Sequence, residues 1–293
     1  MSLAVSIVSF NTKELLKKCL ENLYSQKGIL DLEIWVVDNA SEDGSAEMVE
    51  KEFKRVNLIR SKENLGFAKG QNLAIRKISD DYVLLLNPDT GLPGDALTQM
   101  VEFMDKNPEC GISSCKIVSY DGVMQSNGGD LPFGIALISW LFNLEILGNL
   151  PNYHRSDSSF YKSNKNIGWV GGTFMMVRND VFKNAGLLNE DFFMYFEDVE
   201  FCYRTHKKGY KIRINPEVEI KHISGASSTN PTLRQWKGEI DGLNYFNKKY
   251  FGIIYAQIVK LLIYIGISLR VLAFLILGRF KTANNYFQIL FTI

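Results

Sequence analysis

The first 90 residues of the chain alternate between short apolar runs and longer segments in which apolar residues recur at helical spacing. The short runs are rich in β-branched residues or almost wholly apolar, which predicts strands, and the segments between them predict helices. The predicted strands are residues 3–9, 33–38, 56–59 and 82–86. Because this alternation is typical of a parallel sheet covered by helices, we expect an α/β domain. Asn11 and Glu14 have the spacing of a capping box, which predicts that the first helix begins there.

Small polar or acidic residues follow each predicted strand, where ligands of parallel sheets bind. They lie at residues 10–12, 38–45, 64–67 and 87–90. The first turn reads Ser-Phe-Asn-Thr rather than GxGxxG, and GxxxxGK[ST] does not occur in the sequence. A nicotinamide-dependent Rossmann enzyme and a P-loop ATPase are therefore disfavoured.

Two acidic residues among these strand ends have a chemical and a structural interpretation. Asp38 is suited to accept the imino N–H of a pyrimidine base, or alternatively to cap the turn that follows it. Asp89, directly after Pro88, is suited to bind a divalent ion, although Asn-Pro-Asp alone favours a simple turn. The polar residues at the other strand ends favour the metal interpretation for Asp89.

Composition excludes some classes of function. The 293 residues include 33 Lys and Arg and 32 Asp and Glu, a net charge of +1, which disfavours a nucleic-acid-binding protein. The four cysteines form no CxxC pair, so we expect reduced thiols in a cytosolic protein. Lys13 and Glu14 end the first apolar stretch early, so no signal peptide is expected.

The charge is unevenly distributed. Residues 226–293 hold eight basic and two acidic residues, a net of +6, and residues 251–280 are also the most apolar part of the chain. Lys260 and Arg270 interrupt this stretch, and on a helical wheel they share a polar side with Gln257, Tyr264 and Ser268. A helix from about residue 252 to 278 is therefore predicted to lie in an anionic membrane interface. The alternative is a helix packed on its own domain or, in a homodimer, on a partner chain.

Seven stretches of sequence, in order, resemble family-two glycosyltransferases of the GT-A fold, most closely the bacterial rhamnosyltransferase-like members. They are VSFNT at 8–12, VVDNASEDGS at 36–45, NLGFAKGQN at 64–72, LLLNPDT at 84–90, GWVGGTFMMVR at 168–178, FEDVEFCYRTHKKGY at 196–210 and IKHISGAS at 220–227. The resemblance implies an α/β GT-A domain over residues 1–227, with a mostly parallel nucleotide-binding sheet flanked by helices. Its nucleotide-sugar half would be residues 1–112 and its acceptor half 113–227, followed by a helical C-terminal extension over 228–293.

The resemblance also implies a dTDP- or UDP-linked sugar donor and a divalent metal, manganese or magnesium. The nucleotide-sugar site would comprise Ser9, Phe10, Asn11, Asp38, Asn39, Asn64, Gly66, Asn87 and Asp89. Gly66 and Gly70 would let the backbone approach the ribose and diphosphate. The family's Asp-x-Asp metal motif reads Asn87-Pro88-Asp89 here, so Asp89 would bind the metal together with His222 and diphosphate oxygens. Arg178 and Arg204 could pair either with acidic neighbours or with the diphosphate, and the sequence does not decide between these alternatives.

On the acceptor side, Trp169, Gly171 and Gly172 would form a narrow segment beside the sugar, or alternatively a tight turn next to a core tryptophan. Residues 128–166 are expected to be an irregular acceptor-site loop. Glu197 and Asp198 begin a predicted helix. Taken alone, acidic residues at a helix start are explained by their favourable interaction with the helix dipole. In the family this Asp is the general base, so Asp198 would take that role and Glu197 would orient the acceptor.

The implied function is an inverting glycosyltransferase that moves rhamnose or another hexose to a glycan or lipid-linked acceptor in bacterial cell-surface polysaccharide synthesis. It would act at the cytoplasmic face of the membrane, attached peripherally through the C-terminal helix. A sugar nucleotidyltransferase would need a Gly-rich loop with Arg and Lys where residues 9–13 read Ser-Phe-Asn-Thr-Lys. A catalytically impaired, membrane-docked carbohydrate-binding protein is the other alternative: Asn87 favours it, whereas Asp89, Asp198 and His222 oppose it.

Overall fold

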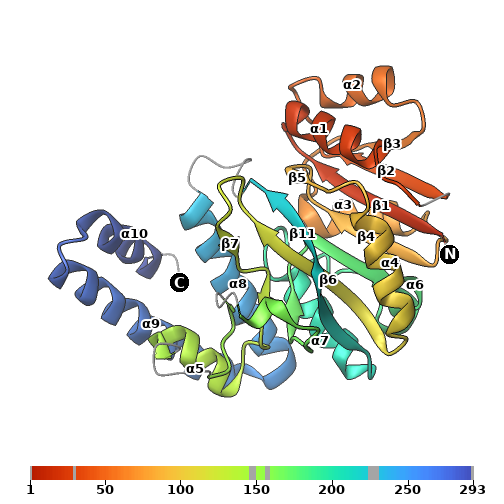
Figure 1. Ribbon diagram of the computed structural model, residues 1–293. Helices are drawn as coiled ribbons and strands as arrows, with labels where there is room; N and C mark the ends of the chain where they lie inside the picture. The colour runs from red at the N-terminus through yellow and green to blue at the C-terminus, as the bar shows by residue number, and fades with distance from the viewer. Residues whose placement is uncertain (1, 29–30, 145–149, 156–158, 224–230, 292–293) are drawn as a thin grey trace. The chain divides into compact units, whose positions relative to one another are not determined.

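A computed structural model describes residues 2–28, 31–144, 150–155, 159–223 and 231–291 (Figure 1). The chain forms two compact units: Met1–Gly129 with His154–Ser227, and Asp130–Tyr153 with Ser228–Ile293. Residues 130–153 thus group with the C-terminal helices, while the predicted domain boundaries remain a prediction. Residues 224–227 of the last predicted motif lie outside the described part of the chain.

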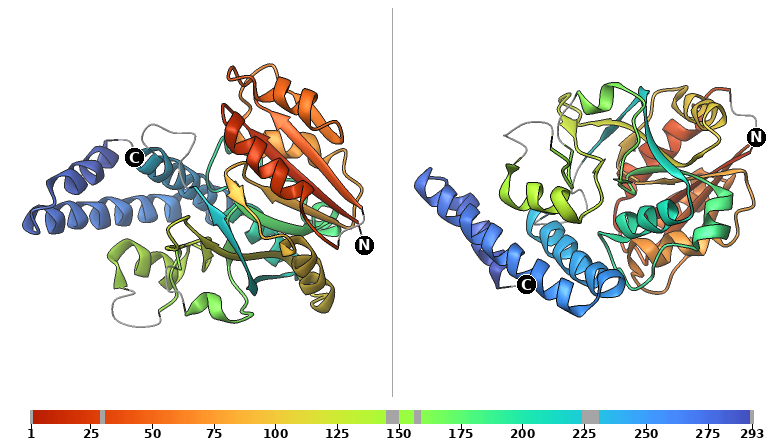
Figure 2. Two further views of the ribbon diagram at one scale, coloured as in Figure 1. Left: turned by 45° about the horizontal axis from the view of Figure 1, so that its top comes forward. Right: turned by 90° about the horizontal axis from the view of Figure 1, so that it is seen from below.

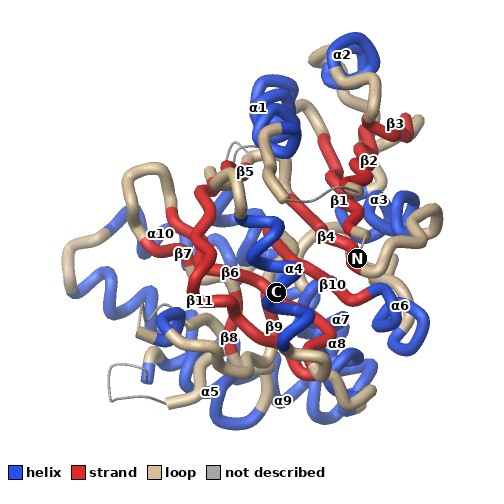
Figure 3. Tube along the Cα trace, turned by 45° about the vertical axis from the view of Figure 1, so that its right-hand side comes forward, coloured by secondary structure: helices blue, strands red, loops and turns tan. Residues whose placement is uncertain are grey.

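The first unit is built on a mixed sheet with the strand order β3-β2-β1-β4-β10-β6-β11-β5, and β7 pairs with β6 (Figure 3). Its strands are β1 (Leu3–Ser9), β2 (Leu32–Asp38), β3 (Val56–Arg60), β4 (Tyr82–Leu86), β5 (Thr90–Gly91), β6 (Cys110–Val118), β7 (Met124–Gln125), β10 (Phe174–Arg178) and β11 (Lys211–His222). A separate hairpin pairs β8 (Gly128–Gly129) with β9 (Trp169–Val170). The helices of this unit are α1 (Lys13–Tyr24), α2 (Ser45–Glu52), α3 (Gly66–Ile75), α4 (Ala96–Lys106), α6 (Asn179–Ala185) and α7 (Glu197–Lys207).

All four strands predicted for the N-terminal half are present, and they pair in parallel as expected. The second half departs from this pattern, because β10 is antiparallel to both β4 and β6, and β5 is antiparallel to β11. The predicted α/β fold is confirmed, with a sheet that is parallel at one side and mixed at the other.

The alternation of side chains along β1 explains why helices cover both faces of the sheet. Leu3, Val5 and Ile7 belong to the hydrophobic core that α1, α2 and α4 complete on one face. On the opposite face, the hydroxyl of Ser6 donates a hydrogen bond to Gln71 of α3. A Cβ atom at Gly70 would lie 2.9 Å from Val8, so Gly70 allows α3 to approach the sheet. Its expected role beside the ribose and diphosphate remains a prediction.

The predicted capping box at Asn11 and Glu14 is wrong. Helix α1 begins at Lys13, and Thr12 at its N-cap makes no side-chain capping bond. The backbone of Asn11 adopts a left-handed conformation with φ 52°, and its Oδ1 accepts the N–H of Glu42 at 2.8 Å. The N–H of Lys13 donates instead to Asp43 Oδ2 at 2.8 Å. The loop after β2 thus supplies the hydrogen-bond acceptor at the start of α1, the role that the sequence had assigned to Asn11.

The second unit consists of α5 (Gly134–Phe142), α8 (Pro231–Phe251), α9 (Ile253–Ile276) and α10 (Phe280–Leu290). Helix α10 folds back alongside α9, as Figure 2 shows, and α9 also contacts α5 and α8. Helix α5 corrects the expectation that residues 128–166 are wholly irregular. The predicted tail helix is confirmed as α9.

Gly66 begins α3 with a φ of +77°, and a Cβ there would lie 2.1 Å from the carbonyl oxygen of Phe193. That oxygen accepts the N–H of Phe67 at 2.9 Å, so it is held in place. Gly122 has a similar φ of +83°, but no atom of the described residues lies within 4 Å of its hypothetical Cβ.

We therefore expect Gly66→Ala to lower the free energy of unfolding well beyond the ~1–2 kcal/mol that a left-handed alanine costs by itself. Gly122→Ala is the matched control, because it carries the conformational cost without the steric clash. Urea-induced unfolding of both variants measures the difference. Equal destabilisation would show that the Phe193 carbonyl does not constrain this position.

Candidate active site

The parallel register of the central strands gathers the predicted nucleotide-binding residues at one edge of the sheet. Ser9 of β1 lies opposite Asp38 of β2, and Ile7 lies opposite Leu86 at the end of β4. Asp38 is buried, and its Oδ2 accepts the N–H of Ser41 at 3.0 Å. Its Oδ1 is buried without a hydrogen-bond partner among the described residues. One oxygen thus caps the turn, and the other can accept a hydrogen bond from a ligand.

The predicted residues of the second and third loops contact one another. Asn39 Nδ2 donates to the carbonyl of Gly66 at 3.0 Å and to Asn64 Oδ1 at 3.4 Å. Asn64 Oδ1 also accepts the N–H of Gly66 at 3.0 Å. These bonds hold the two loops together, and they leave Asn39 Oδ1 buried and unpaired within the described structure.

The first loop presents Phe10 and Asn11 to solvent. Ser9 is fully buried, its hydroxyl pairs with Thr12 at 2.9 Å, and its carbonyl accepts the N–H of Asn39 at 2.8 Å. Phe10 is 37% exposed, so its ring is accessible to a ligand. The hydroxyl and the carbonyl of Ser9 are thus both engaged within the fold, and its predicted contact with the nucleotide remains a prediction.

The candidate metal ligands, Asp89 and His222, are neighbours. His222 lies opposite Thr90 in the β5–β11 pair, and Asp89 precedes Thr90 in the chain. This register places His222 Nε2 3.3 Å from Asp89 Oδ1, with both side chains largely buried. The Asn87 carbonyl accepts the hydroxyl of Thr90 at 2.8 Å, which fixes the Asn-Pro-Asp turn.

This pair fits a divalent cation. Asp89 Oδ1 is buried without a hydrogen bond within the described residues, so it is an unsatisfied acceptor beside an imidazole nitrogen. No cluster of three or more His, Cys, Asp or Glu suited to a metal occurs within the described ranges. The remaining ligands would therefore be diphosphate oxygens and water, as expected for a hard cation that binds with its substrate.

Helix α7 places Glu197 and Asp198 at its N-terminus, after Tyr195 and Phe196, whose backbones are left-handed with φ 72° and 77°. Such conformations are costly for non-glycine residues and are often found at functional sites. Asp198 is half-buried; its Oδ2 accepts the N–H of Gly172 at 3.1 Å, and its Oδ1 accepts the N–H of Val199 at 2.8 Å. These bonds fix the orientation of the carboxylate.

Glu197 is more deeply buried than its neighbour Asp198. The side chain is 4% exposed, and Oε2 is buried without a hydrogen bond in the described structure. Burial, with a smaller contribution from the charge of Asp198, raises the pKa of Glu197 to about 8. A carboxyl group with this pKa is mostly protonated at pH 7, so it is a poor proton acceptor there. This favours Asp198 as the base.

The glycines predicted to lie near the acceptor are required by packing around Asp198. A Cβ at Gly171 would lie 2.6 Å from Asn127 Oδ1 and 3.7 Å from Asp198 Oδ2, and a Cβ at Gly172 would lie 2.7 Å from the ring of Phe67. Trp169 is only 6% exposed and makes an edge contact with His154. Its predicted contact with the acceptor remains a prediction, and the core-tryptophan alternative agrees with its burial.

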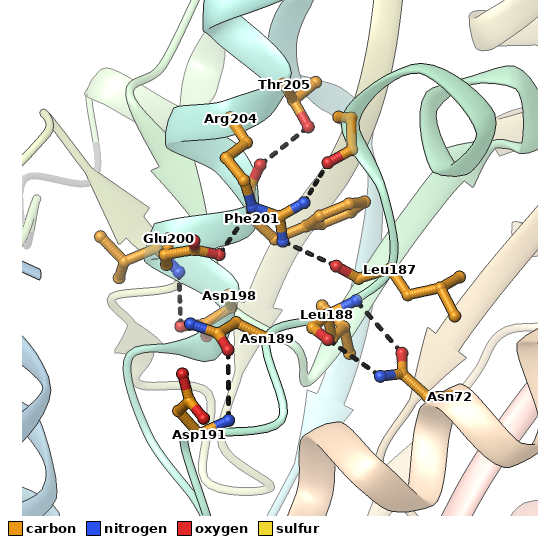
Figure 4. Close-up of polar contacts among 12 residues, drawn as sticks. Asn72, Leu187, Leu188, Asn189, Asp191, Asp198, Glu200, Phe201, Arg204 and Thr205 are labelled. Carbon is orange, nitrogen blue, oxygen red and sulfur yellow. Dashed lines mark hydrogen bonds and ion pairs between the residues drawn. The ribbon is translucent and has the colours of Figure 1, made fainter. Parts of the chain in front are cut away.

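Arg204 holds the segment that precedes α7 (Figure 4). Its guanidinium donates to Glu200 at 2.8 Å, to the carbonyl of Leu187 at 2.7 Å and to the carbonyl of Ala185. Asn72 of α3 binds both the N–H and the carbonyl of Leu188. Arg204 is therefore engaged within the fold, which decides against a diphosphate contact.

Arg178 lies opposite Tyr82, at the amino-terminal end of β4 and away from the candidate site. It donates to the Tyr82 hydroxyl at 3.1 Å and to the carbonyl of Met104 at 3.0 Å. Arg178 is thus also a structural residue.

Two residues at the site were not predicted, Gln125 and Asn127. Gln125 Oε1 lies 2.7 Å from His222 Nδ1, and Gln125 Nε2 donates to the His222 carbonyl at 3.1 Å. Asn127 is buried, and its Nδ2 donates to the hydroxyl of Ser114 at 2.7 Å. Their one sequence signal is the polar run Gln-Ser-Asn-Gly-Gly at 125–129, which resembles an ordinary loop.

Comparison with known proteins agrees with this geometry. A family model described as glycosyl transferase family 2 matches residues 4–185. The chain is 29% identical over 232 residues to the low-salt glycan biosynthesis hexosyltransferase Agl10 of Haloferax volcanii, covering 78% of this chain and 69% of that protein. It is 25% identical over 213 residues to the N-acetylglucosaminyl-diphospho-decaprenol L-rhamnosyltransferase of Mycobacterium tuberculosis, covering 67% of each.

Among solved structures, the mannosyltransferase PcManGT of Pyrobaculum calidifontis, in complex with GDP-Man and Mn²⁺, has a TM-score of 0.61. The two sequences are 18% identical, and the match covers 97% of this chain and 73% of the mannosyltransferase chain. This likeness concerns the fold. The GT-A fold expected from the sequence motifs is thus confirmed. Because the family model covers more than half of the chain, the protein belongs to glycosyl transferase family 2.

Proposed function

We propose that this protein is an inverting, divalent-metal-dependent hexosyltransferase that transfers a sugar from a nucleoside diphosphate to a hydroxyl group of a glycan or lipid-linked acceptor. The observation that carries the proposal is the presence, within one compact unit, of the Asp89–His222 pair and of an oriented Asp198 carboxylate. The mannosyltransferase of similar fold contains GDP-Man and Mn²⁺, which supports a sugar nucleotide and a metal here. The mycobacterial relative's name specifies rhamnose and a lipid-diphosphate-linked sugar, which supports rhamnose as a candidate donor sugar.

The donor would lie across the edge of the sheet formed by β1, β2 and β4. Asp38 Oδ1, buried and unpaired in the described structure, would accept the imino N–H of uracil or thymine. Phe10 is accessible beside it. Asp89 and His222 would hold a divalent ion, which when bound supplies positive charge that stabilises the departing diphosphate.

Asp198 would act as the general base. It takes the proton from the acceptor hydroxyl as that oxygen forms a bond to the anomeric carbon. The bond from this carbon to the diphosphate oxygen breaks, and the electron pair leaves with the nucleoside diphosphate. A single displacement of this kind inverts the anomeric configuration. Glu197, neutral at pH 7, would be able to donate a hydrogen bond to the acceptor.

The second unit would attach the enzyme to an anionic membrane surface at the cytoplasmic face. Among the described residues, α9 is the helix with the length and hydropathy of a membrane span. Its most apolar 18-residue segment has a mean hydropathy of 2.2, and a third of that segment is buried. One side of α9 carries seven apolar residues that are each 42–86% exposed, which we call the α9 stripe. They are Ile254, Ile258, Leu261, Ile265, Leu269, Leu272 and Ile276. Exposed basic residues lie near both ends of α9, Lys248 and Lys249 before it and Arg279 and Lys281 after it, which favours anionic lipid.

The predicted role of Arg270 in this attachment is wrong. Its guanidinium donates to Asn143 at 2.8 Å and to the carbonyl of Trp140, and it lies 5.4–6.0 Å from the ring centroids of Trp140, Trp236 and Tyr286. Arg270 therefore stabilises the second unit internally. Attachment would depend on the apolar α9 stripe rather than on this charge.

The first prediction from this proposed function concerns the metal. Asp89→Asn is expected to weaken Mn²⁺-dependent binding of UDP or dTDP by more than the ~10–100-fold typical for loss of an outer-shell partner, because it removes a direct ligand. His222→Ala should weaken it less, since Asp89 and the diphosphate remain. Isothermal calorimetry with and without Mn²⁺ measures the effect. The exposed Asp180→Asn is the control, and unchanged nucleotide affinity in Asp89→Asn would exclude the assigned site.

The second prediction concerns the base. Asp198→Asn should preserve donor binding and reduce sugar transfer by about 100- to 10,000-fold, because it removes the proton acceptor but keeps the shape. Glu197→Gln should reduce transfer much less at pH 7, because it replaces an already neutral group. Transfer from UDP- and dTDP-sugars to polyprenyl-diphosphate-linked sugars gives the rates. A larger loss in Glu197→Gln would reverse the two roles.

The third prediction concerns the membrane. Replacing Ile258, Leu261 and Ile265 with Ser should lower affinity for phosphatidylglycerol vesicles at least about tenfold, because the apolar area available for burial falls. Surface substitutions are preferable to truncation, since Val259 and Ile263 of the same helix are buried. The control is Val123→Ser, an exposed apolar residue of the first unit. If the wild type ignores vesicles and the triple variant dissociates a dimer, the stripe is a homodimer interface.

A further inference from the structure

His222 is held by a side chain from a different strand. Gln125 ends β7, which pairs with β6, and β6 in turn pairs with β11, where His222 is the last residue. Gln125 contacts His222 twice: its Oε1 is 2.7 Å from the ring Nδ1, and its Nε2 donates to the His222 backbone carbonyl at 3.1 Å. Both polar atoms of one amide are thus used to orient one imidazole.

The second contact determines the first. A backbone carbonyl oxygen only accepts hydrogen bonds, so the amide nitrogen of Gln125 must face it. Gln125 Oε1 must then face the imidazole, and because this oxygen also only accepts, Nδ1 must carry the hydrogen. A neutral imidazole has one N–H, so Nε2 of His222 has a free lone pair.

That lone pair lies beside another acceptor. His222 Nε2 is 3.3 Å from Asp89 Oδ1, which is buried and without a hydrogen bond among the described residues. Two adjacent buried acceptors repel each other, and a cation bound by both removes the repulsion. In the opposite tautomer, the hydrogen on Nε2 would occupy the lone-pair position that a cation bound by both side chains needs.

We propose that Gln125 is a positioning residue that holds His222 in the Nδ1–H tautomer and thereby keeps the Asp89–His222 pair open to a divalent cation. This inference rests on the metal site of the proposed function. It gives Gln125 the role that outer-shell groups have at many metal centres, where the partner of the second ring nitrogen fixes the tautomer and the ring orientation.

The test compares Gln125→Leu with Gln125→Glu in the full chain. Leu removes both contacts, whereas Glu loses the donor to the His222 carbonyl but keeps an acceptor for Nδ1–H, so it should restore the tautomer that Leu loses. Ser126→Ala is the matched control, because the Ser126 hydroxyl contacts the Gly128 carbonyl at 3.3 Å and the side chain of Tyr161 rather than His222. The ¹⁵N chemical shifts of His222 in metal-free protein report the tautomer, and calorimetry with Mn²⁺ alone and with UDP reports metal affinity.

We expect the Nδ1–H tautomer in the wild type, in Ser126→Ala and in Gln125→Glu. In Gln125→Leu the Nε2–H tautomer should become populated, and Mn²⁺ affinity should fall about 10- to 100-fold. A circular dichroism spectrum and melting temperature close to wild type establish that Gln125→Leu is folded.

Three results would contradict the account, and they differ in what they overturn. An imidazolium or an Nε2–H tautomer in metal-free wild type at pH 8 overturns the tautomer assignment. Mn²⁺ binding through Asp89 and His222 that is unchanged in folded Gln125→Leu overturns the role of Gln125 alone. The third result is a tautomer that depends on Gln125 in a protein that binds no Mn²⁺, with or without UDP. It overturns the metal site of the proposed function, and with it the effect of Gln125 on metal binding.

Discussion

The site depends on hydrogen-bonded register between strands that are distant in sequence. Parallel pairing places the end of β1 beside the end of β2, so Ser9 and Asp38 become neighbours. Antiparallel pairing of the two-residue strand β5 with β11 places Asp89 beside His222. A shift of one residue in either pairing would turn the side chains to the other face of the sheet. The short β5 pairing is thus as important for the chemistry as the long parallel sheet.

Environment, rather than residue type, distinguishes the two carboxyl groups at the start of α7. Glu197 is buried, and its raised pKa of about 8 leaves it neutral at pH 7. Asp198 is half-buried and accepts two backbone N–H groups, from Gly172 and Val199. Neighbouring acids with separate environments commonly take separate roles in enzymes. The absence of a side chain at Gly172 matters here, because it lets the Phe67 ring and the Asp198 carboxylate pack against the same backbone.

Local sequence was sufficient for the elements and residues that follow from periodicity and motif. The four N-terminal strands, α7 and α9 were predicted because each is long or strongly patterned, and Asp89 and His222 were identified because they occur in motifs. Gln125 was missed because β7 has only two residues and its contact with His222 spans 97 positions of sequence. Arg270 was misassigned because a helical wheel contains no information about Trp140, Trp236 and Tyr286, which surround its guanidinium. Likewise, the capping box at Asn11 failed because Asp43, from another loop, provides the acceptor.

The central claim is that Asp198 activates an acceptor hydroxyl for one direct displacement at the anomeric carbon. The configuration of the product tests this most directly. The enzyme, Mn²⁺ and a UDP- or dTDP-sugar of known anomeric configuration would be incubated with a polyprenyl-diphosphate-linked sugar, and the new linkage would be assigned by ¹H–¹³C coupling. A linkage inverted relative to the donor is the predicted result. Retention of the donor configuration would contradict the single displacement and the role assigned to Asp198.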